Sequence, residues 1–374
     1  MEKKLKTTQG LILGLLTTIL FVSNSSIYAA DSANSDFSIH TKAYLSYESE
    51  LDSDNGLQGG AFKIRRSYLT IKKNLFKHLS FRMTLDAHQD NTGDMKVRLK
   101  YVYAHYKFDD IGFITKPNIE FGLVHMPWLD FEERINYYRM QGTMFMERSG
   151  LFNSADFGFT AAGYLGGEIN DEYKKNVNKK YPGRYGSFAF GVYNGSGYHA
   201  IESTENKTIE GRLTIRPLPD VVPGLQLSYF GVFGKGNTEY EVDTLGNLKT
   251  PDWQVNAAML SYEHQYFTLT GQFMSGKGNQ KGEYIFDNYE ATGLSGFSAF
   301  AEIKPDENWR IIGRYDSFNP NTDIDDNEEQ RFILGLGYDF GHHNILILDF
   351  DKTIYAEEDR GDKNLLKLTM QVSF

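Results

Sequence analysis

Residues 79–85 have the sequence LSFRMTL, in which apolar and polar side chains alternate position by position. Alternation with a period of two puts one set of side chains on each face of a β-strand, whereas a helical face repeats every 3.6 residues. The same pattern is present in residues 37–40 and returns in residues 253–259, 267–273 and 332–340. The sequence therefore predicts an all-β protein whose sheet has one apolar and one polar face.

Segments of this kind fill the chain from residue 37 to its end. We expect about sixteen of them, the strand number of a channel-sized transmembrane antiparallel β-barrel. The expected spans are 37–48, 60–74, 78–89, 94–108, 117–126, 157–167, 185–195, 206–217, 224–234, 252–263, 266–276, 294–304, 308–318, 330–341, 343–355 and 364–374.

The connections between these segments alternate in length. Tight turns are expected at 74–77, 263–266, 304–308 and 341–343, and longer polar stretches at 49–59, 235–251, 276–292 and 319–329. Short turns on one side and long loops on the other are typical of an outer-membrane barrel with a periplasmic N-terminus. The connection 167–183, with Lys174, Lys175, Lys179 and Lys180, is long where a short turn is expected.

A soluble β-sandwich is the alternative architecture, because its strands alternate in the same way around a shared apolar core. Aromatic residues near the expected strand ends favour the barrel instead, since aromatic girdles mark the two interfaces of a bilayer. These residues include Trp253, Phe267, Trp309, Phe332 and Phe340.

The first 30 residues are predicted to be a signal peptide, followed by one barrel domain at 31–374. Lys3, Lys4 and Lys6 precede a short apolar core at 11–22, and small residues near Ala30 offer a cleavage site. The alternative for this segment is an uncleaved N-terminal anchor. Cleavage would remove three bases and one acid and change the net charge from −10 to −12.

Charge and cysteine content exclude several classes of function. A strongly acidic chain does not fit nucleic-acid binding, which uses a basic surface. The chain has no cysteine, so disulfides, thiolate zinc sites and cysteine nucleophiles are excluded. No G-x-S-x-G motif is present, and we expect no enzyme activity, no metal site and no cofactor.

The last strand ends on an aromatic residue, Phe374, after alternating residues 366–373. This ending resembles the assembly signal of bacterial outer-membrane barrels. The resemblance implies insertion by the barrel assembly machinery, while the plainer alternative is an ordinary amphipathic final strand.

Several short stretches resemble the phosphate-selective porin O/P family. They are residues 62–72, 81–86, 141–156, 193–195 and 211–217. The resemblance implies a sixteen-stranded homotrimeric porin with inward-folded loops and a basic lumen that attracts anions.

Charged residues of the strands are expected to face the pore, because Arg or Lys facing lipid costs roughly 2–4 kcal/mol at the bilayer midplane. In residues 96–103, the alternation of lipid-facing apolar residues with pore-facing charged residues predicts that Lys96 faces the pore and that Tyr101 and Tyr103 face lipid. The alternative is that the bases merely pair with acids across strands. The expected pore-lining, anion-attracting residues are Arg66, Arg82, Lys96, Arg98, Lys100, Arg212 and Arg314.

Two details of the pore are predicted from local pattern. Arg65 and Arg66 are adjacent, and the apolar phase changes between Ile64 and Leu69, so we expect a β-bulge there and favour Arg66 as the pore-facing residue. The third loop, 126–157, is the expected inward-folded constriction, because its aromatic content suits a packed lumen. Its candidate charged residues are Glu133, Arg134, Arg139, Glu147 and Arg148. An exposed lid or a trimer-contact loop is the alternative.

The sequence thus favours a passive porin of the bacterial outer membrane for small hydrophilic solutes, with a preference for anions such as phosphate. The expected partners are these solutes, outer-membrane lipid, two further copies of the chain and the assembly machinery. The alternative is a receptor or adhesin barrel whose long loops bind ligands.

Overall fold

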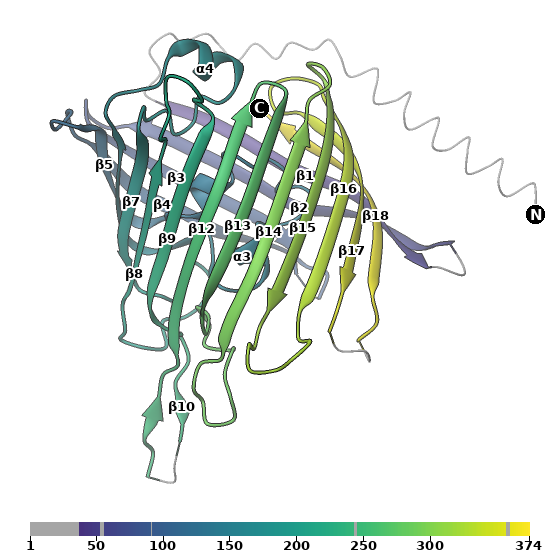
Figure 1. The fold of residues 1–374 in the computed structure, drawn as a ribbon. Coiled ribbons are helices and arrows are strands. Elements are labelled where there is room, and N and C mark those ends of the chain that lie inside the picture. Colours follow the sequence, from purple (N-terminus) through teal and green to yellow (C-terminus); the bar gives the residue numbers. More distant parts are fainter. Residues whose placement is uncertain (1–36, 53–55, 91, 243–244, 357–359) are drawn as a thin grey trace, which may run out of the picture. The chain divides into compact units, whose positions relative to one another are not determined.

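A computed structural model describes residues 37–52, 56–90, 92–242, 245–356 and 360–374. They form one compact unit, Phe37–Phe374, and the predicted signal peptide at 1–30 lies outside the described residues. Its sixteen long antiparallel strands close into a barrel in which β1 pairs with β18 (Figure 1). The barrel strands are β1 Phe37–Asp52, β2 Gly56–Asn74, β3 Leu79–Gln89, β4 Met95–Lys107, β5 Ile114–His125, β6 Ala155–Leu165, β7 Gly186–Tyr193, β8 Thr208–Ile215, β9 Leu225–Lys235, β12 Asp252–His264, β13 Phe267–Lys277, β14 Gly293–Ile303, β15 Trp309–Asn319, β16 Glu329–Asp339, β17 Ile345–Ile354 and β18 Lys363–Ser373.

This architecture confirms the predicted all-β barrel and its strand number, and it excludes the two-sheet sandwich. Short turns lie mostly at the barrel end that holds the C-terminus, and longer loops mostly at the other end (Figure 1); the long connection between β6 and β7, which contains α4 Asp171–Asn176, lies at the end with the short turns. One long loop carries a small hairpin of β10 Tyr240–Glu241 and β11 Leu248–Lys249. We call the two ends the turn side and the loop side.

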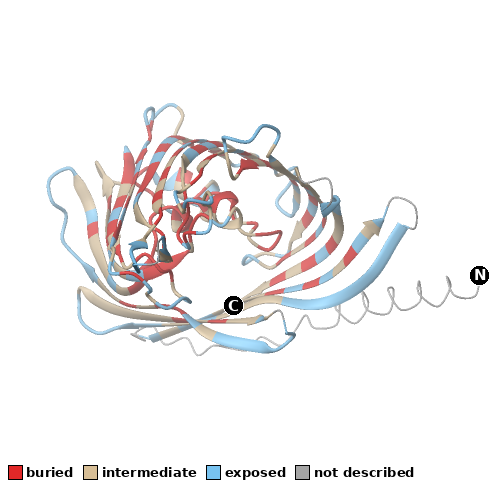
Figure 2. Cartoon of the chain, turned by 90° about the horizontal axis from the view of Figure 1, so that it is seen from below, coloured by how far each residue is buried: buried red, intermediate tan, exposed pale blue. Residues whose placement is uncertain are grey.

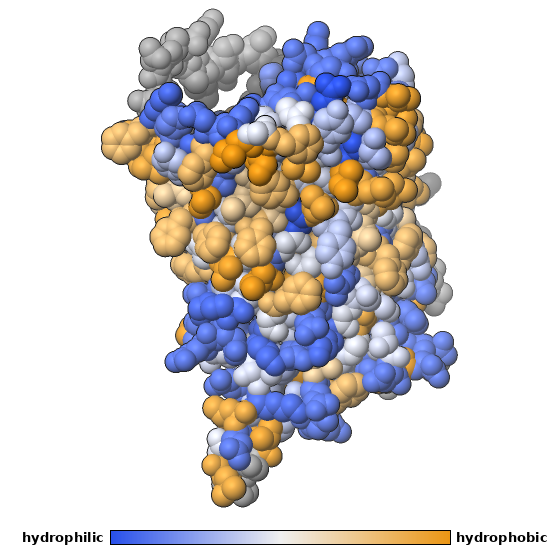
Figure 3. Space-filling model, turned by 60° about the vertical axis from the view of Figure 1, so that its left-hand side comes forward, coloured by the Kyte–Doolittle hydropathy of each residue, from blue (hydrophilic) through white to orange (hydrophobic). Residues whose placement is uncertain are grey.

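The face of the outer wall drawn in Figure 3 is apolar at mid-height, with polar residues above and below. Within the described residues, no helix is long and apolar enough to cross a membrane. Exposed apolar side chains alternate with buried ones along strands such as β8, β9 and β12, as expected for a wall between lipid and lumen. Exposed apolar residues of the strands include Leu213, Leu227, Leu260, Leu269, Phe273 and Phe297.

Strand β4 departs from the predicted phase at one position. Thr84 pairs with Tyr101 and Leu85 with Leu99, so Lys100 is an extra residue without a partner on β3. The prediction that Tyr101 and Tyr103 face lipid is therefore wrong, and both side chains are buried on the inner face. A β-bulge shifts the alternation by one residue. No feature that we identified in the β4 sequence indicates this bulge.

The predicted bulge on β2 is present. Arg66 pairs with Tyr44 and Ile64 pairs with Leu45, which leaves Arg65 as the extra residue. The bulge brings both arginines to the lumen side, since Arg65 reaches Glu48 at 2.6 Å and Arg66 reaches Asp86 at 3.0 Å. Sequence favoured only Arg66 because strict alternation allows only one of two neighbours to face inward.

Backbone hydrogen bonds at Phe374 help to close the barrel. The Thr41 amide donates to the Phe374 carbonyl at 2.8 Å, and the Phe374 amide donates to the Thr41 carbonyl at 3.2 Å. The Phe374 side chain is 81% exposed, so it contributes little packing to the folded barrel.

We expect Phe374→Ala to lower the amount of heat-modifiable, membrane-inserted protein, because the terminal aromatic residue resembles the assembly signal of outer-membrane barrels and its ring packs little against the folded wall. Phe340→Ala is the matched control, since Phe340 is another exposed aromatic residue, just after β16. Gel mobility of boiled and unboiled membrane fractions measures the inserted fraction. Equal losses in both variants would make Phe374 an ordinary girdle residue.

Candidate ion pathway

The segment between β5 and β6 lies inside the ring of strands (Figure 2). It contains two single-turn helices, α2 Leu129–Glu132 and α3 Phe145–Arg148. Its aromatic and aliphatic side chains pack against inward residues of β9 and β12–β15, which fills that part of the barrel with an apolar core. The core contains Met126, Trp128, Leu129, Phe131, Ile135, Met144, Phe145, Met146, Leu151 and Phe152 of the segment, with Phe230, Val232, Trp253, Val255, Met259, Met274, Leu294 and Phe318 of the strands.

One buried acid lies within this packed segment. The Trp128 indole nitrogen donates to Glu132 at 2.8 Å. Burial raises the pKa of Glu132 to about 7, and the nearby Arg314 guanidinium only partly offsets that effect. Glu132 is buried, which agrees with a segment packed against the wall.

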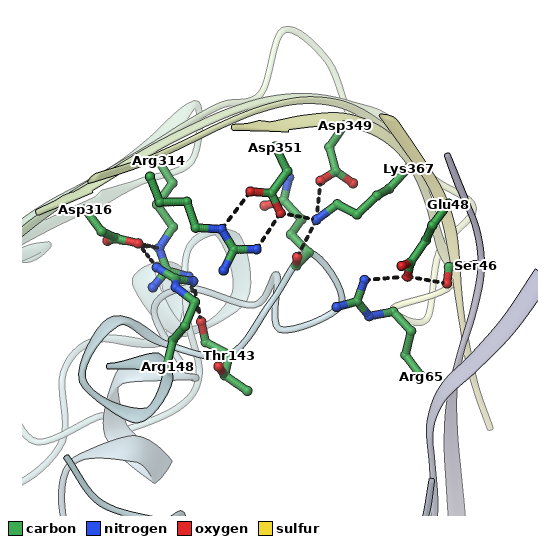
Figure 4. A network of polar contacts seen from close by, with 12 residues as sticks. Ser46, Glu48, Arg65, Thr143, Arg148, Arg314, Asp316, Asp349, Asp351 and Lys367 are labelled. Atoms are coloured by element: carbon green, nitrogen blue, oxygen red, sulfur yellow. Dashed lines mark hydrogen bonds and ion pairs between the residues drawn. The ribbon is translucent and has the colours of Figure 1, made fainter. Parts of the chain in front are cut away.

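Charged groups of β15–β18 hold the segment in place (Figure 4). The Lys367 ammonium donates to the Gln141 carbonyl at 2.8 Å and pairs with Asp351 at 2.6 Å and with Asp349 at 3.1 Å. The Arg314 guanidinium donates to the Thr143 carbonyl at 3.1 Å. These contacts fix residues 141–143 against the wall.

Asp316 forms ion pairs with two of the arginines predicted for the site. It pairs with Arg148 from the segment and, at 3.1 Å, with Arg314 from its own strand. Arg314 is 6% exposed and lies beneath the segment. Its charge therefore anchors the segment and does not line open space, which differs from the predicted pore-lining position.

Arg212 of β8 is covered in a similar way. It donates to the Pro127 carbonyl at 3.1 Å and to the Ser187 hydroxyl at 3.0 Å, and its guanidinium lies 4.3 Å from the centre of the Phe131 ring. It is 2% exposed. Alternation correctly gave its inward direction but could not reveal that residues 127–131 cover it.

Two cavities inside the barrel meet at Tyr44 and Arg139, which line both. The turn-side cavity, about 730 Å³, extends to the turn at His342 and His343. The loop-side cavity, about 350 Å³, extends to Asp90 near the loop end of β3. The junction at Tyr44 and Arg139 is therefore the candidate constriction between the two.

Basic residues dominate the turn-side cavity. Asp130 and Glu133 are its two acids, and each is already paired, Asp130 with Arg134 at 3.2 Å and Glu133 with Arg139 at 2.5 Å. None of the other six bases forms an ion pair with a carboxylate in the described part of the chain. These six unpaired bases are Lys42, Lys72, Arg82, Lys100, Lys179 and Lys180.

Arg139 is the most constrained charge at the junction. It donates to Glu133 at 2.5 Å and to the two carboxylate oxygens of Glu147 at 2.5 and 2.8 Å. Its side chain is 8% exposed. Burial opposes its charge, but the Glu133 and Glu147 carboxylates outweigh that effect and hold the pKa of Arg139 well above its usual range. The guanidinium therefore stays charged where the cavities meet.

The remaining predicted bases lie on the lumen side in different states of pairing. Lys96 pairs with Asp90 at 2.6 Å, at the loop end of the wall. Arg98 pairs with Asp86, which also pairs with Arg66; the Arg98 Nε atom lies 3.1 Å from the Asp86 carboxylate. Lys100 lines the turn-side cavity, with its ammonium 4.9 Å from the centre of the Tyr68 ring. Lys96, Arg98 and Lys100 thus do not form an evenly spaced series of free charges.

The sequence pattern did not predict several residues that line this pathway. Lys179 and Lys180 line the turn-side cavity from the connection 167–183, and Tyr44 lines the junction. The unexpected length and lysine content of that connection was the available signal. Among the described residues, no group of three or more metal-ligating side chains could hold a metal ion.

A closed sixteen-stranded barrel, with a segment packed inside it and charged cavities beside that segment, is the architecture of a porin. Residues 42–229 match the family described as phosphate-selective porin O and P, and the chain belongs to that family. No curated protein matches this chain. The family and the fold are those of passive outer-membrane channels, and they point to the bacterial outer membrane.

Solved structures with the same fold include three outer-membrane proteins of low sequence identity. An anion-selective porin from Comamonas acidovorans has a TM-score of 0.57 at 11% identity, covering 90% of this chain and 99% of that chain. OmpT of Vibrio cholerae has 0.58 at 9%, covering 90% and 97%. The outer-membrane channel DcaP of Acinetobacter baumannii has 0.55 at 9%, covering 92% and 99%. At these identities the similarity establishes the fold alone.

Proposed function

We propose that this chain is a passive channel for small hydrophilic solutes that prefers anions such as phosphate. The observation that carries the preference is the turn-side cavity, where eight bases face two acids and both acids are already paired. Rings of like charge are how pores select ions by sign. Fixed charges act over about 8 Å at physiological ionic strength, so the lumen charge matters more for a passing ion than the net charge of the chain.

The arrangement of the six unpaired bases favours conduction of an anion over its tight binding. They come from four strands and one connection: Lys42 on β1, Lys72 on β2, Arg82 on β3, Lys100 on β4, and Lys179 and Lys180 between β6 and β7. Conduction requires sites that attract an ion without holding it deeply, and spreading the charge over several places meets that requirement.

The biological setting follows from the same proposal. The chain would reach the outer membrane through a cleaved signal peptide at 1–30, be inserted by the barrel assembly machinery and function as a homotrimer among outer-membrane lipids. A trimer form of OmpT of Vibrio cholerae supports the homotrimer, and the anion-selective porin from Comamonas acidovorans supports the selectivity. No cofactor and no covalent chemistry are part of this function.

The purified protein in a planar bilayer with a KCl gradient tests the preference. We expect the reversal potential to have the sign of chloride selectivity and to approach zero as salt rises, because salt screens the lumen charge. A reversal potential whose sign indicates potassium selectivity would overturn the proposed anion preference. If the inserted protein carried no current, the proposal that it is a channel would be wrong.

A further inference from the structure

The connection between β6 and β7 returns into the barrel mouth instead of forming a tight turn. It contains α4, Asp171–Asn176, at the turn side (Figure 1). Glu168 holds the base of the connection, pairing with Lys174 at 2.9 Å and with Lys116 of β5. Residues 177–183 follow α4, and we call them the strap.

Two residues dock the strap onto the segment inside the barrel. The Asn178 amide nitrogen donates to the Arg134 carbonyl at 2.8 Å and to Glu263 of β12 at 2.6 Å. The Tyr137 hydroxyl donates to the Asn178 side-chain oxygen at 3.0 Å. The Lys180 amide also donates to the Asn178 side-chain oxygen, at 2.8 Å. Asn178 is buried, so these four hydrogen bonds replace contacts that water would otherwise supply.

Tyr181 is the second docking residue. Its hydroxyl donates to Asp130 at 2.6 Å, and its ring lies 5.1 Å from the Phe131 ring and 5.0 Å from the Arg212 guanidinium. Burial raises the pKa of the Tyr181 hydroxyl well above its usual range, so the hydroxyl remains a donor to Asp130. Asn178 and Tyr181 therefore fix the strap at two points only three residues apart.

Lys179 and Lys180 lie between these two docking residues and are exposed. Both line the turn-side cavity, and both also line a neighbouring cavity of about 540 Å³ bounded by β5–β7. Burial and then the nearby Arg134 lower the pKa of the Lys180 ammonium, as expected beside other positive charge. The docking on both sides therefore holds these two lysines at the border of both cavities.

We propose that the strap forms a second cationic narrowing, in series with the Arg139 junction, at which Lys179 and Lys180 set anion passage at the periplasmic mouth. The proposal rests on the proposed anion channel and adds to it a selectivity element contributed by a periplasmic connection. An anion that has passed Arg139 still has to cross the turn-side cavity, whose mouth the strap borders. Asn178 and Tyr181 are positioning residues, because they act by fixing the two lysines.

The chain has no cysteine, so single substitutions can be labelled without background. Lys179→Cys and Lys180→Cys are each treated from the periplasmic side of a bilayer with the anionic reagent 2-sulfonatoethyl methanethiosulfonate. We expect chloride conductance to fall about twofold or more, because each label replaces a positive charge by a negative one in the ion path. The same two variants, labelled instead with the cationic reagent 2-aminoethyl methanethiosulfonate, should have the conductance of the unsubstituted channel, because this label restores a positive charge.

Lys77→Cys and Lys175→Cys are the matched controls, since both are exposed turn-side lysines that line neither cavity. Labelling them should leave conductance unchanged. The proposed second narrowing would be wrong if labelling had equal effects in the test and control variants. It would also be wrong if labelled Lys179→Cys and Lys180→Cys channels had unchanged conductance. The anion preference of the unsubstituted channel is read separately from its reversal potential, so the two proposals can fail independently.

A docking variant tests the positioning role. Asn178→Ala combined with Tyr181→Phe keeps both lysines but removes the side-chain hydrogen bonds that fix them. We expect several conductance levels in place of one, with labelling of Lys179→Cys losing its effect in this background. A single unaltered level with the full labelling effect would show that Asn178 and Tyr181 do not position the lysines.

Discussion

Arg139→Gln is expected to shift the channel from anion toward cation preference. The substitution removes the guanidinium at the junction of the two cavities and leaves Glu133 and Glu147 without their common partner. A unit charge about 4 Å from an ion contributes about 1 kcal/mol in bulk water and about 4 kcal/mol near a protein surface. We therefore expect the ratio of chloride to potassium permeability, obtained from the reversal potential, to fall about tenfold, equivalent to about 1.4 kcal/mol.

Two controls separate the charge from the fold. Arg139→Gln combined with Glu133→Gln and Glu147→Gln removes the released acids, and it should recover most of the anion preference through the six unpaired bases. Arg184→Gln breaks an exposed pair with Asp220 outside both cavities and should leave selectivity unchanged. An Arg139→Gln channel with the selectivity of the unsubstituted protein would place the constriction elsewhere.

Lys367→Met should cause a larger loss of stability than any surface lysine substitution. The Lys367 side chain is 1% exposed and lies between the buried carboxylates of Asp349 and Asp351. Asp351 retains Arg331, but Asp349 has no other ion-pair partner among the described residues. Breaking a buried pair by removing one partner costs about 3–5 kcal/mol. The loss also removes the hydrogen bond to the Gln141 carbonyl, so the inner segment should fluctuate.

The unfolding temperature of the heat-modifiable band and the open-channel noise measure these two effects. Lys352→Met is the matched control, because it breaks an exposed pair with Asp362 at 3.2 Å and exposed pairs contribute little. Lys367→Met combined with Asp349→Asn should recover part of the stability by removing the unpaired acid. An unfolding temperature for Lys367→Met equal to that of Lys352→Met would contradict the anchoring role.

Local pattern determined the wall of this protein. Alternation in stretches such as 79–85, and the rhythm of short and long connections, gave the closed barrel and its strand number. The change of apolar phase between Ile64 and Leu69 gave the β2 bulge. These features depend on backbone geometry within one strand or one turn, where the side-chain direction follows from the position in sequence. The aromatic content of residues 126–157 also indicated a packed segment, for the same reason that exposed aromatic clusters are unfavourable.

Tertiary structure alone decided which charges are free. Arg212, Arg314 and Lys100 have the same inward direction in the sequence pattern, yet the first two lie under the inner segment and Lys100 lines open space. Lys179 and Lys180 line the cavity from a connection that Asn178 and Tyr181 dock onto residues 44 and 51 positions earlier in the chain. Alternation gives the face of a strand on which a charge lies. Whether that charge is paired, covered or open depends on segments far away in sequence, whose positions no local pattern contains.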